Sequence, residues 1–431
     1  MTAATLLTLS ALTGQARAQE QAAADPSADV DSGSDTALLP VAPAEIAPPT
    51  TPDEAASLEQ GIYGEDQALI DAPAEPDAQS RPWKVNLHAS AGSYYDNNIF
   101  ISSIDRQSDF VSLLSAGGGL TLGDYTARQN NYLISDYTGI AELFGRNSGQ
   151  DAYEQNASLE GQFLLGHVTV HGQFQLEDSA DEDIDIGTRV NRQIYIGEGS
   201  ARCDISDKTY IEATAELTVA HYDLYLDSND ERGEISFNYL PDPSVTVGLG
   251  VLGGVLNVED SSSQTYEQLL SSLHVAATGK FSLNASAGVE DRQTADNNGL
   301  ITPVFELSGD YKPFENLDLN LTGYRRVVNS AYYAGSDLIA TGVSAGAQYQ
   351  LSPRFTLLLG GGYVNSDYRD IATGPGIARD DDYVYVRPAF RYTASPYCNV
   401  ELYYLYRDND SSLDTSSFND TQTGASVNFT Y

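Results

Sequence analysis

The sequence is poor in the residue types on which many protein classes depend. Its 431 residues include two Cys, one Met and one Trp, and 22 Lys+Arg stand against 61 Asp+Glu, a formal charge of -39. So few basic residues exclude a nucleic-acid-binding protein, because phosphates would find nothing to neutralise them. Two cysteines are too few for a disulfide scaffold, and neither has the CxxC or His-rich surroundings of a metal site.

Long apolar runs and helical stripes are also scarce. No stretch beyond the first residues approaches the roughly 18 consecutive apolar residues of a membrane helix, and apolar positions with helical spacing are almost absent. The sequence is instead rich in Tyr (28), Phe (13) and Gly (37), and 41% of it is hydrophobic. This composition excludes a disordered acidic chain and favours many strands and turns.

The first residues predict an export signal. An apolar run that includes Leu6, Leu7, Leu9 and Leu12 is followed by Ala16-Arg17-Ala18, which is typical of a secretory signal over residues 1–18 with a small-residue cleavage site. No basic residue precedes the apolar run, so the true initiation site could lie further upstream. A short buried helix is the alternative interpretation.

Residues 19–82 form a second region, rich in Ala, Pro, Asp and Glu. Fourteen acidic residues and one basic residue, Arg81, give it a charge of -13, and repeated prolines interrupt any helix. We therefore expect a disordered periplasmic linker. Residues 55–72 could form a short helix that docks to a partner or to the barrel mouth, or a transient helix without function.

Alternation dominates the rest of the chain. Between residues 168 and 177, apolar residues or Gly occupy every even position and polar residues every odd one, and the same period of two recurs at 211–219, 281–290 and 317–322. One face of each strand is therefore apolar and the other polar. A soluble β-sandwich with one solvent-exposed face would show the same pattern, so the lengths of the loops must distinguish the two folds.

The length of a loop depends on whether it follows an odd-numbered or an even-numbered strand. We expect eighteen strands, near 83–96, 108–122, 130–144, 152–165, 167–177, 189–203, 209–226, 232–240, 245–259, 264–277, 281–292, 301–311, 317–327, 337–351, 355–369, 382–393, 398–408 and 421–431. Connections after even strands are short, whereas those after odd strands, such as 178–188 and 409–420, tend to be longer and acidic. This pattern predicts a closed transmembrane β-barrel over residues 83–431 in a bacterial outer membrane, with sixteen strands as the nearest alternative.

The chain ends are consistent with that location. The last strand places Thr423, Val427, Phe429 and the terminal Tyr431 on one face, which resembles the C-terminal signature of barrels inserted by the outer-membrane barrel assembly machinery. We therefore expect that machinery, outer-membrane lipid and lipopolysaccharide as partners. Tyrosines near strand ends predict an interfacial girdle, although ordinary strand propensity also explains them.

A short motif points to a family. Residues 95–100, Tyr-Asp-Asn-Asn-Ile-Phe, resemble the Tyr-Asp-x-Asn-Ile-Phe element of the beta-barrel porin 2 family of outer-membrane barrels. Members of that family are often encoded with exopolysaccharide synthesis and export systems. The resemblance thus implies an export role, with polysaccharide or periplasmic export components as partners, and it supplies no catalytic residues.

The residues offer little for an enzyme. There is no GxSxG, HExxH, P-loop or nucleotide motif among them, so we predict no catalytic residues, metal or cofactor. Acidic runs at 181–185 and 227–231 lack the Gly and closing Glu of a calcium loop and are better interpreted as solvated loops. A membrane-embedded hydrolase is the least favoured alternative.

The polar strand faces predict the lumen. Inward acids are expected to form one wall and inward arginines the opposite wall, so that a transverse field orients polar solutes. The alternative is local pairing, with Glu401 in register to meet Arg387 or Arg391. Aromatic side chains near the basic wall suggest sugar stacking, with strand propensity as the alternative. The predicted acidic wall is Glu160, Glu177, Glu212 and Glu216; the basic wall is Arg326, Arg387, Arg391 and Arg407; the aromatics are Tyr324, Tyr383, Tyr385 and Tyr403.

Two functions follow from this fold. The first is a porin-like pore for polar solutes or exopolysaccharide, with no chemical step. The second is a docking barrel with a plugged lumen, whose acidic linker recruits a periplasmic partner. The topology also places Cys203 and Cys398 seven strands apart, about 33 Å along the wall, which excludes a disulfide between them.

Overall fold

The computed structural model describes residues 83–123, 130–277, 279–295, 299–369 and 379–431. The predicted signal and linker, residues 1–82, lie outside the described residues. Among those described, no helix is both long and apolar enough to span a membrane. Strands account for most of the structure, as the alternating pattern predicts.

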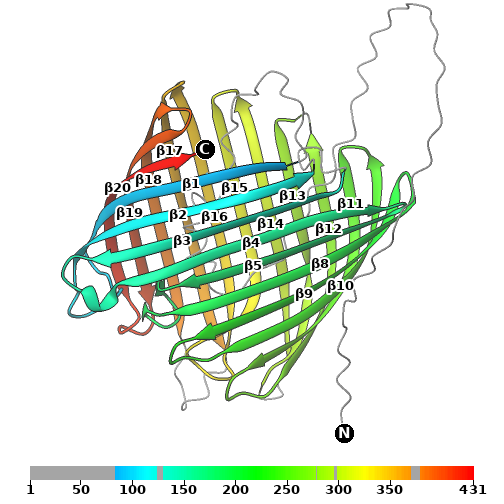
Figure 1. Ribbon diagram of the computed structural model, residues 1–431. Helices are drawn as coiled ribbons and strands as arrows, with labels where there is room; N and C mark the ends of the chain where they lie inside the picture. The colour runs from blue at the N-terminus through cyan, green and yellow to red at the C-terminus, as the bar shows by residue number, and fades with distance from the viewer. Residues whose placement is uncertain (1–82, 124–129, 278, 296–298, 370–378) are drawn as a thin grey trace, which may run out of the picture. The chain divides into compact units, whose positions relative to one another are not determined.

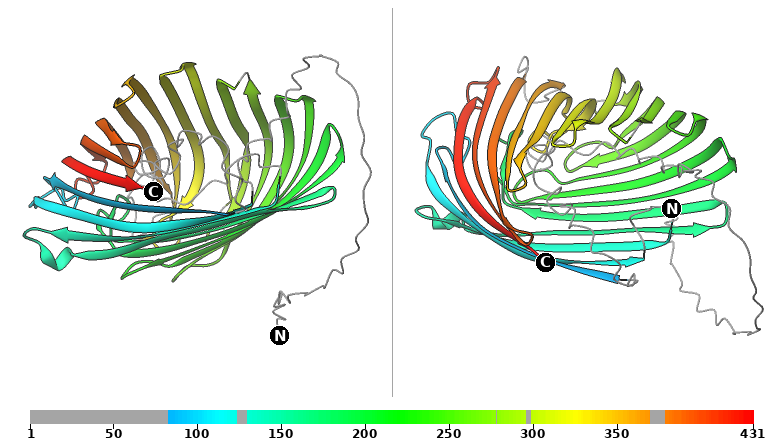
Figure 2. Two further views of the ribbon diagram at one scale, coloured as in Figure 1. Left: turned by 45° about the horizontal axis from the view of Figure 1, so that its top comes forward. Right: turned by 90° about the horizontal axis from the view of Figure 1, so that it is seen from above.

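Eighteen antiparallel strands form one sheet that closes on itself (Figures 1 and 2). Each strand pairs with the next along the chain, and β1 pairs with β20 over His88–Asp96. The eighteen-strand prediction is therefore confirmed over sixteen. The barrel strands are β1 (Trp83–Asp96), β2 (Asp109–Gly123), β3 (Tyr132–Phe144), β4 (Ala152–Leu165), β5 (Val168–Ser179), β8 (Arg192–Ser206), β9 (Thr209–Tyr222), β10 (Ser228–Asp242), β11 (Val245–Val258), β12 (Gln264–Ala277), β13 (Phe281–Gln293), β14 (Gly299–Phe314), β15 (Leu317–Asn329), β16 (Asp337–Ser352), β17 (Phe355–Arg369), β18 (Asp380–Ser395), β19 (Cys398–Ser411) and β20 (Phe418–Thr430).

The two faces of the sheet differ as the period of two requires. In β18, Val384 and Val386 are 42% and 38% exposed, whereas Tyr383 and Tyr385 are 3% and 2% exposed. The outward face carries the apolar side chains that lipid requires, and the inward face carries most of the charge. Both cysteines are free, in agreement with the predicted topology.

The parity of the connections is confirmed except after β2, where residues 124–131 separate the two strands. One rim of the barrel is closed by tight turns, such as those between β4 and β5 and between β16 and β17, and we call it the short-turn end. The other rim carries the longer connections and is called the long-loop end. Two further strands, β6 (Glu182–Asp183) and β7 (Thr188–Arg189), pair only with each other between β5 and β8.

The Tyr-Asp-Asn-Asn-Ile-Phe motif lies at the seam where the barrel closes. The amide of Asn98 donates to the Asp96 carboxylate over 2.6 Å, and its side-chain amide donates to the carbonyl of Asn419 over 3.2 Å. Asn97 accepts from the amide of Thr421 over 2.9 Å, while Ile99 is fully buried. The motif therefore ties the end of the first strand to the start of the last one.

Candidate functional site

All twelve predicted lumen residues lie on the inward face. Their positions alternate with exposed, mainly apolar residues along each strand, and several contact side chains on adjacent strands. Tyr132 of β3 and His171 of β5, for example, both bond Glu160 of β4, over 2.6 and 3.2 Å. The roles that the sequence suggests for these residues, two charged walls and an aromatic surface, stay a prediction.

Residues 180–191, which contain β6 and β7, form a hairpin inside the barrel, and we call this segment the lumen hairpin. It contacts β3, β8, β19 and the connection between β15 and β16. These strands are far apart in the sheet, and the lumen hairpin contacts each of them on the inward face of the sheet. A single short segment can reach all of them only through the interior.

Buried ion pairs hold the lumen hairpin to several walls. Arg189 pairs with Glu142 of β3, and Glu182 lies 3.4 Å from Arg407 of β19. Asp183 lies 3.9 Å from Arg192 of β8. Because each of these arginines is almost fully buried, loss of one partner would leave an uncompensated charge.

The tip of the lumen hairpin is held most tightly. The guanidinium of Arg379 donates to the carbonyls of Asp185 and Ile184 over 2.6 and 2.8 Å. The Asp185 carboxylate accepts from the Ser330 hydroxyl and the Ala331 amide, each over 2.8 Å. The tip therefore bridges the segment before β18 and the connection between β15 and β16.

Electrostatics at the lumen hairpin are dominated by burial and these arginines. Burial opposes ionisation of Glu182, but the charges of Arg407 and Arg189 outweigh it and lower the pKa of Glu182. At Asp185 burial dominates over Arg379, so the pKa of Asp185 is raised. The pKa of Arg379 is raised, because burial is outweighed by Tyr368 and the neighbouring carboxylates.

The position of the lumen hairpin corrects one expectation. Residues 178–188 were expected to form an outward, solvated acidic loop. The structure extends β5 to Ser179 and turns the following acids inward, where arginines from distant strands neutralise them. Nothing local to the segment distinguishes these acids from solvated ones.

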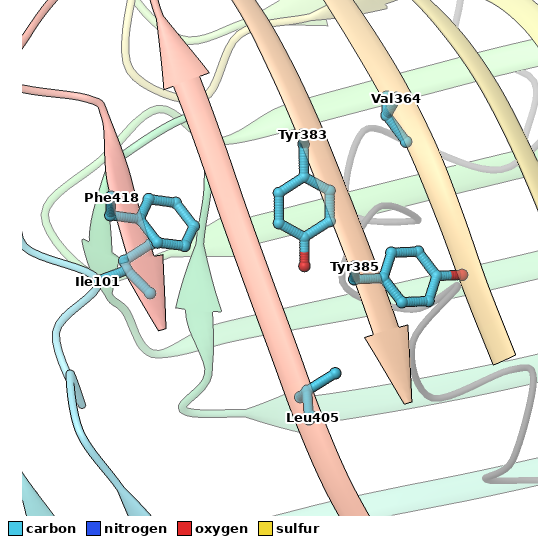
Figure 3. Close-up of a cluster of buried hydrophobic side chains, with 6 residues drawn as sticks. All are labelled: Ile101, Val364, Tyr383, Tyr385, Leu405 and Phe418. Atoms are coloured by element: carbon cyan, nitrogen blue, oxygen red, sulfur yellow. The ribbon is translucent and has the colours of Figure 1, made fainter. Parts of the chain in front are cut away.

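An apolar cluster lies beside the lumen hairpin (Figure 3). Tyr383 and Tyr385 project from β18 toward side chains of neighbouring strands, and Ile184 of the lumen hairpin packs against the group. The cluster consists of Ile101, Val364, Tyr383, Tyr385, Leu405 and Phe418. These two tyrosines are therefore largely covered rather than presented to a passing sugar.

The predicted basic wall is neutralised largely by strand neighbours. Arg387 and Arg391 both contact Glu401, at 2.9 and 3.0 Å, and Arg407 lies 2.6 Å from Asp420. Arg326 lies over the ring of Tyr324, 4.3 Å from its centroid. Local pairing, the alternative derived from the sequence, thus describes three of the four arginines.

The acidic wall shows the same pairing at two positions. Glu177 lies 3.2 Å from Arg192, and Glu216 lies 2.7 Å from Arg232 on the adjacent strand. Because opposite charges at these separations largely cancel at a distance, only the remaining groups could contribute to the predicted transverse field.

Inward tyrosines lie between a glycine and an arginine. Tyr324 of β15 covers Gly342 of β16 and lies under Arg326. Tyr403 of β19 likewise covers Gly424 of β20 and lies 4.5 Å below Arg387. The rings therefore lie flat against the wall, and cation–π contacts occupy their inner faces.

Replacing Gly342 with Ala should destabilise the barrel. A Cβ at this position would lie 2.6 Å from the Tyr324 ring, so the ring would have to move. We expect a loss of about 1–3 kcal/mol in the free energy of unfolding, measured by urea denaturation in lipid vesicles. Gly323→Ala is the matched control, because its Cβ would have 3.7 Å of clearance; equal effects of the two variants would contradict this packing.

A cavity of about 670 Å³ occupies part of the lumen. Inward residues of β3 to β5 and β8 to β15 line it, including the predicted residues Glu212, Glu216, Tyr324 and Arg326. It extends to Lys208 and Pro243 in turns of the short-turn end. No residue of the lumen hairpin lines it, so the cavity and the hairpin occupy different parts of the interior.

The fold and this lumen define an outer-membrane β-barrel of the porin type. Residues 256–431 match the family described as "Putative beta-barrel porin 2", which confirms the resemblance first indicated by the motif at 95–100. The match covers the strands from the end of β11 to the C-terminus. No curated protein sequence matches the chain.

The chain is also similar to solved outer-membrane proteins at low sequence identity. OpdK from Pseudomonas aeruginosa is 12% identical, with a TM-score of 0.42, over 81% of this chain and 99% of its own. OccAB3 from Acinetobacter baumannii is 9% identical, with a TM-score of 0.43, over 81% of this chain and 100% of its own. OpdQ from Pseudomonas aeruginosa is 10% identical, with a TM-score of 0.43, over 82% and 99% of the two chains.

Proposed function

We propose that the barrel is a pore through which small polar solutes pass beside the lumen hairpin. The observation that carries this proposal is the cavity, which is lined by charged, hydroxyl and amide side chains and reaches the short-turn end. A wet, polar interior is what a diffusion pore requires. Passage through the pore makes no chemical bond, so the size and charge of a solute decide whether it passes.

The long-loop end favours small solutes over polymer chains. There the connections after β9 and β15 meet, with the amide of Leu226 donating to the carbonyl of Ala331 over 3.0 Å. The lumen hairpin is anchored to the same connection through Asp185. An extended exopolysaccharide would require these segments to separate, whereas a monosaccharide-sized solute needs only a gap beside them.

The docking barrel is the second candidate, and the buried ion pairs of the lumen hairpin favour it. A hairpin fixed to several walls could serve as a plug, leaving the barrel as a platform for a periplasmic partner. The linker that would recruit this partner, residues 19–82, lies outside the described residues.

Planar-bilayer recording separates the two functions. The purified full-length chain is expected to give stepwise currents in KCl that persist at low voltage. Uptake into proteoliposomes should be faster for glucose than for a long dextran, because the long-loop end narrows the path. Barrels that insert but pass no current under any voltage would instead support the docking function.

A further inference from the structure

The cavity contains more acid than base, and the excess is not spread evenly. Among its lining residues seven are Asp or Glu and five are Arg or Lys, an excess of two acids. Glu216 is paired with Arg232 at 2.7 Å, and Glu198 accepts from the side-chain amide of Gln173 over 3.0 Å. The question is therefore which carboxylate stays available to a solute.

Glu234 is such a carboxylate on a strand of the wall, whereas Asp207 lies in the turn between β8 and β9 at the rim. Glu234 projects inward from β10, two residues from Arg232, whose guanidinium turns instead to Glu216 of β9. Glu234 makes no hydrogen bond or ion pair with any other residue that the structure describes. It is only partly buried, so solvent and solutes in the cavity can reach it.

The wall beside Glu234 is rich in oxygen atoms. The Glu234 carboxylate lies over Gly250 of β11, in the space that a Cβ would occupy. The carbonyl oxygen of Asn238 lies in the same way over Gly248, where the Ser272 hydroxyl also approaches. Between them, Ser236 accepts from the Asn238 amide over 2.9 Å. The two glycines thus leave room for a carboxylate, an amide oxygen and hydroxyls to lie side by side on the cavity wall.

This set of groups fits an ammonium ion. An alkylammonium presents three N–H donors and one positive charge, and it is satisfied by one carboxylate together with neutral oxygen acceptors. A hard divalent cation needs six or more oxygen ligands, often with several carboxylates, and no group of three or more His, Cys, Asp or Glu in the described part of the chain could hold a metal. One partly exposed carboxylate also gives the weak binding that lets a solute leave.

We propose that the cavity binds solutes that carry an alkylammonium group, with Glu234 as the residue that contacts the charge. This inference rests on the proposed pore and specifies its preferred solutes. Glu234 sets a preference for cations along the path, and Ser236, Asn238 and Ser272 accept the remaining N–H groups of the ammonium.

The test is block of the potassium current by putrescine in planar bilayers containing the full-length protein. Putrescine is expected to reduce the current in a concentration-dependent way, and Glu234→Gln should weaken this block about tenfold, the effect of losing one charge-assisted hydrogen bond. Glu234→Gln should also lower the cation preference measured from the reversal potential in a KCl gradient. Glu234→Asp keeps the charge and should retain most of both properties.

The matched control is Glu231→Gln on the same strand. Glu231 is exposed on the opposite face of β10, so its loss should leave block and selectivity unchanged. If putrescine blocked Glu234→Gln as strongly as it blocks the wild-type protein, the ammonium site would be overturned and the pore would stand. Absence of any current in the wild-type protein would instead overturn the pore, and the site with it.

Discussion

Removing the lumen hairpin should increase single-channel conductance about twofold or more, because the conducting cross-section would then include the space that the hairpin fills. The design follows from the register: Ser179 of β5 pairs directly with Arg192 of β8. Residues 180–191 can therefore be replaced by an Asn-Gly turn that closes the two strands as a hairpin. The conductance is measured in planar bilayers against the intact protein.

A finer variant removes only the anchor of the hairpin tip. Arg379→Ala withdraws two hydrogen bonds to main-chain carbonyls and leaves Asp185 buried with less compensation. Loss of a buried charged partner costs about 3–5 kcal/mol, so the tip should detach from the wall more often. This motion should appear as fluctuations of the current between two levels. Arg369→Ala is the control, because the Arg369 side chain is half-exposed and its guanidinium pairs with Asp367 on the same strand. If the wild-type protein, the hairpin deletion and Arg379→Ala all gave equal, steady currents, the hairpin would not narrow the pore.

Replacing Glu401 with Ala should strongly destabilise the barrel. Glu401 is 2% exposed, and it accepts from Arg387 over 2.9 Å and from Arg391 over 3.0 Å. Its removal leaves two largely buried guanidiniums facing each other, at a cost of about 3–5 kcal/mol. Urea unfolding in vesicles measures this change in the free energy of unfolding.

The triple variant Glu401→Leu, Arg387→Met, Arg391→Met distinguishes charge from volume. If lost compensation causes the damage, replacing all three charges with apolar side chains of similar size should recover most of the stability. Glu231→Ala serves as the control on the outward face and should change the free energy of unfolding by less than about 0.5 kcal/mol. A triple variant as unstable as Glu401→Ala would indicate that packing, rather than charge, is responsible.

The strands could be predicted from the sequence because each obeys a rule that is local. Alternation along β5 and β9 requires only residues within the strand, and tight turns such as the one at Pro353 mark the short-turn end. The inward faces of Glu212 and Tyr403 follow from the same period. Even the Arg387–Glu401 pair could be anticipated, because the two residues lie on adjacent strands in register.

The interior could not be predicted in the same way, because its partners are distant in the sequence. The acids at 181–185 resemble a solvated loop until Arg379 and Arg407, some two hundred residues later, are placed opposite them. The inward tyrosines likewise depend on glycines of the next strand and on arginines, which come from the same strand for Tyr324 and from the preceding strand for Tyr403. The closure of the barrel brings these groups together, and closure is not encoded in a local pattern.

The central claim is that residues 180–191 lie across the lumen rather than outside it, and one cross-link tests it directly. Asp185 and Ser330, which hydrogen bond over 2.8 Å, are replaced by Cys in a protein whose own cysteines are replaced by Ser. After mild oxidation of the membrane-inserted protein, disulfide formation is scored by mobility on a non-reducing gel. The structure predicts near-complete cross-linking with conductance still present, whereas two cysteines that stay reduced and react freely with a membrane-impermeant thiol reagent would contradict it.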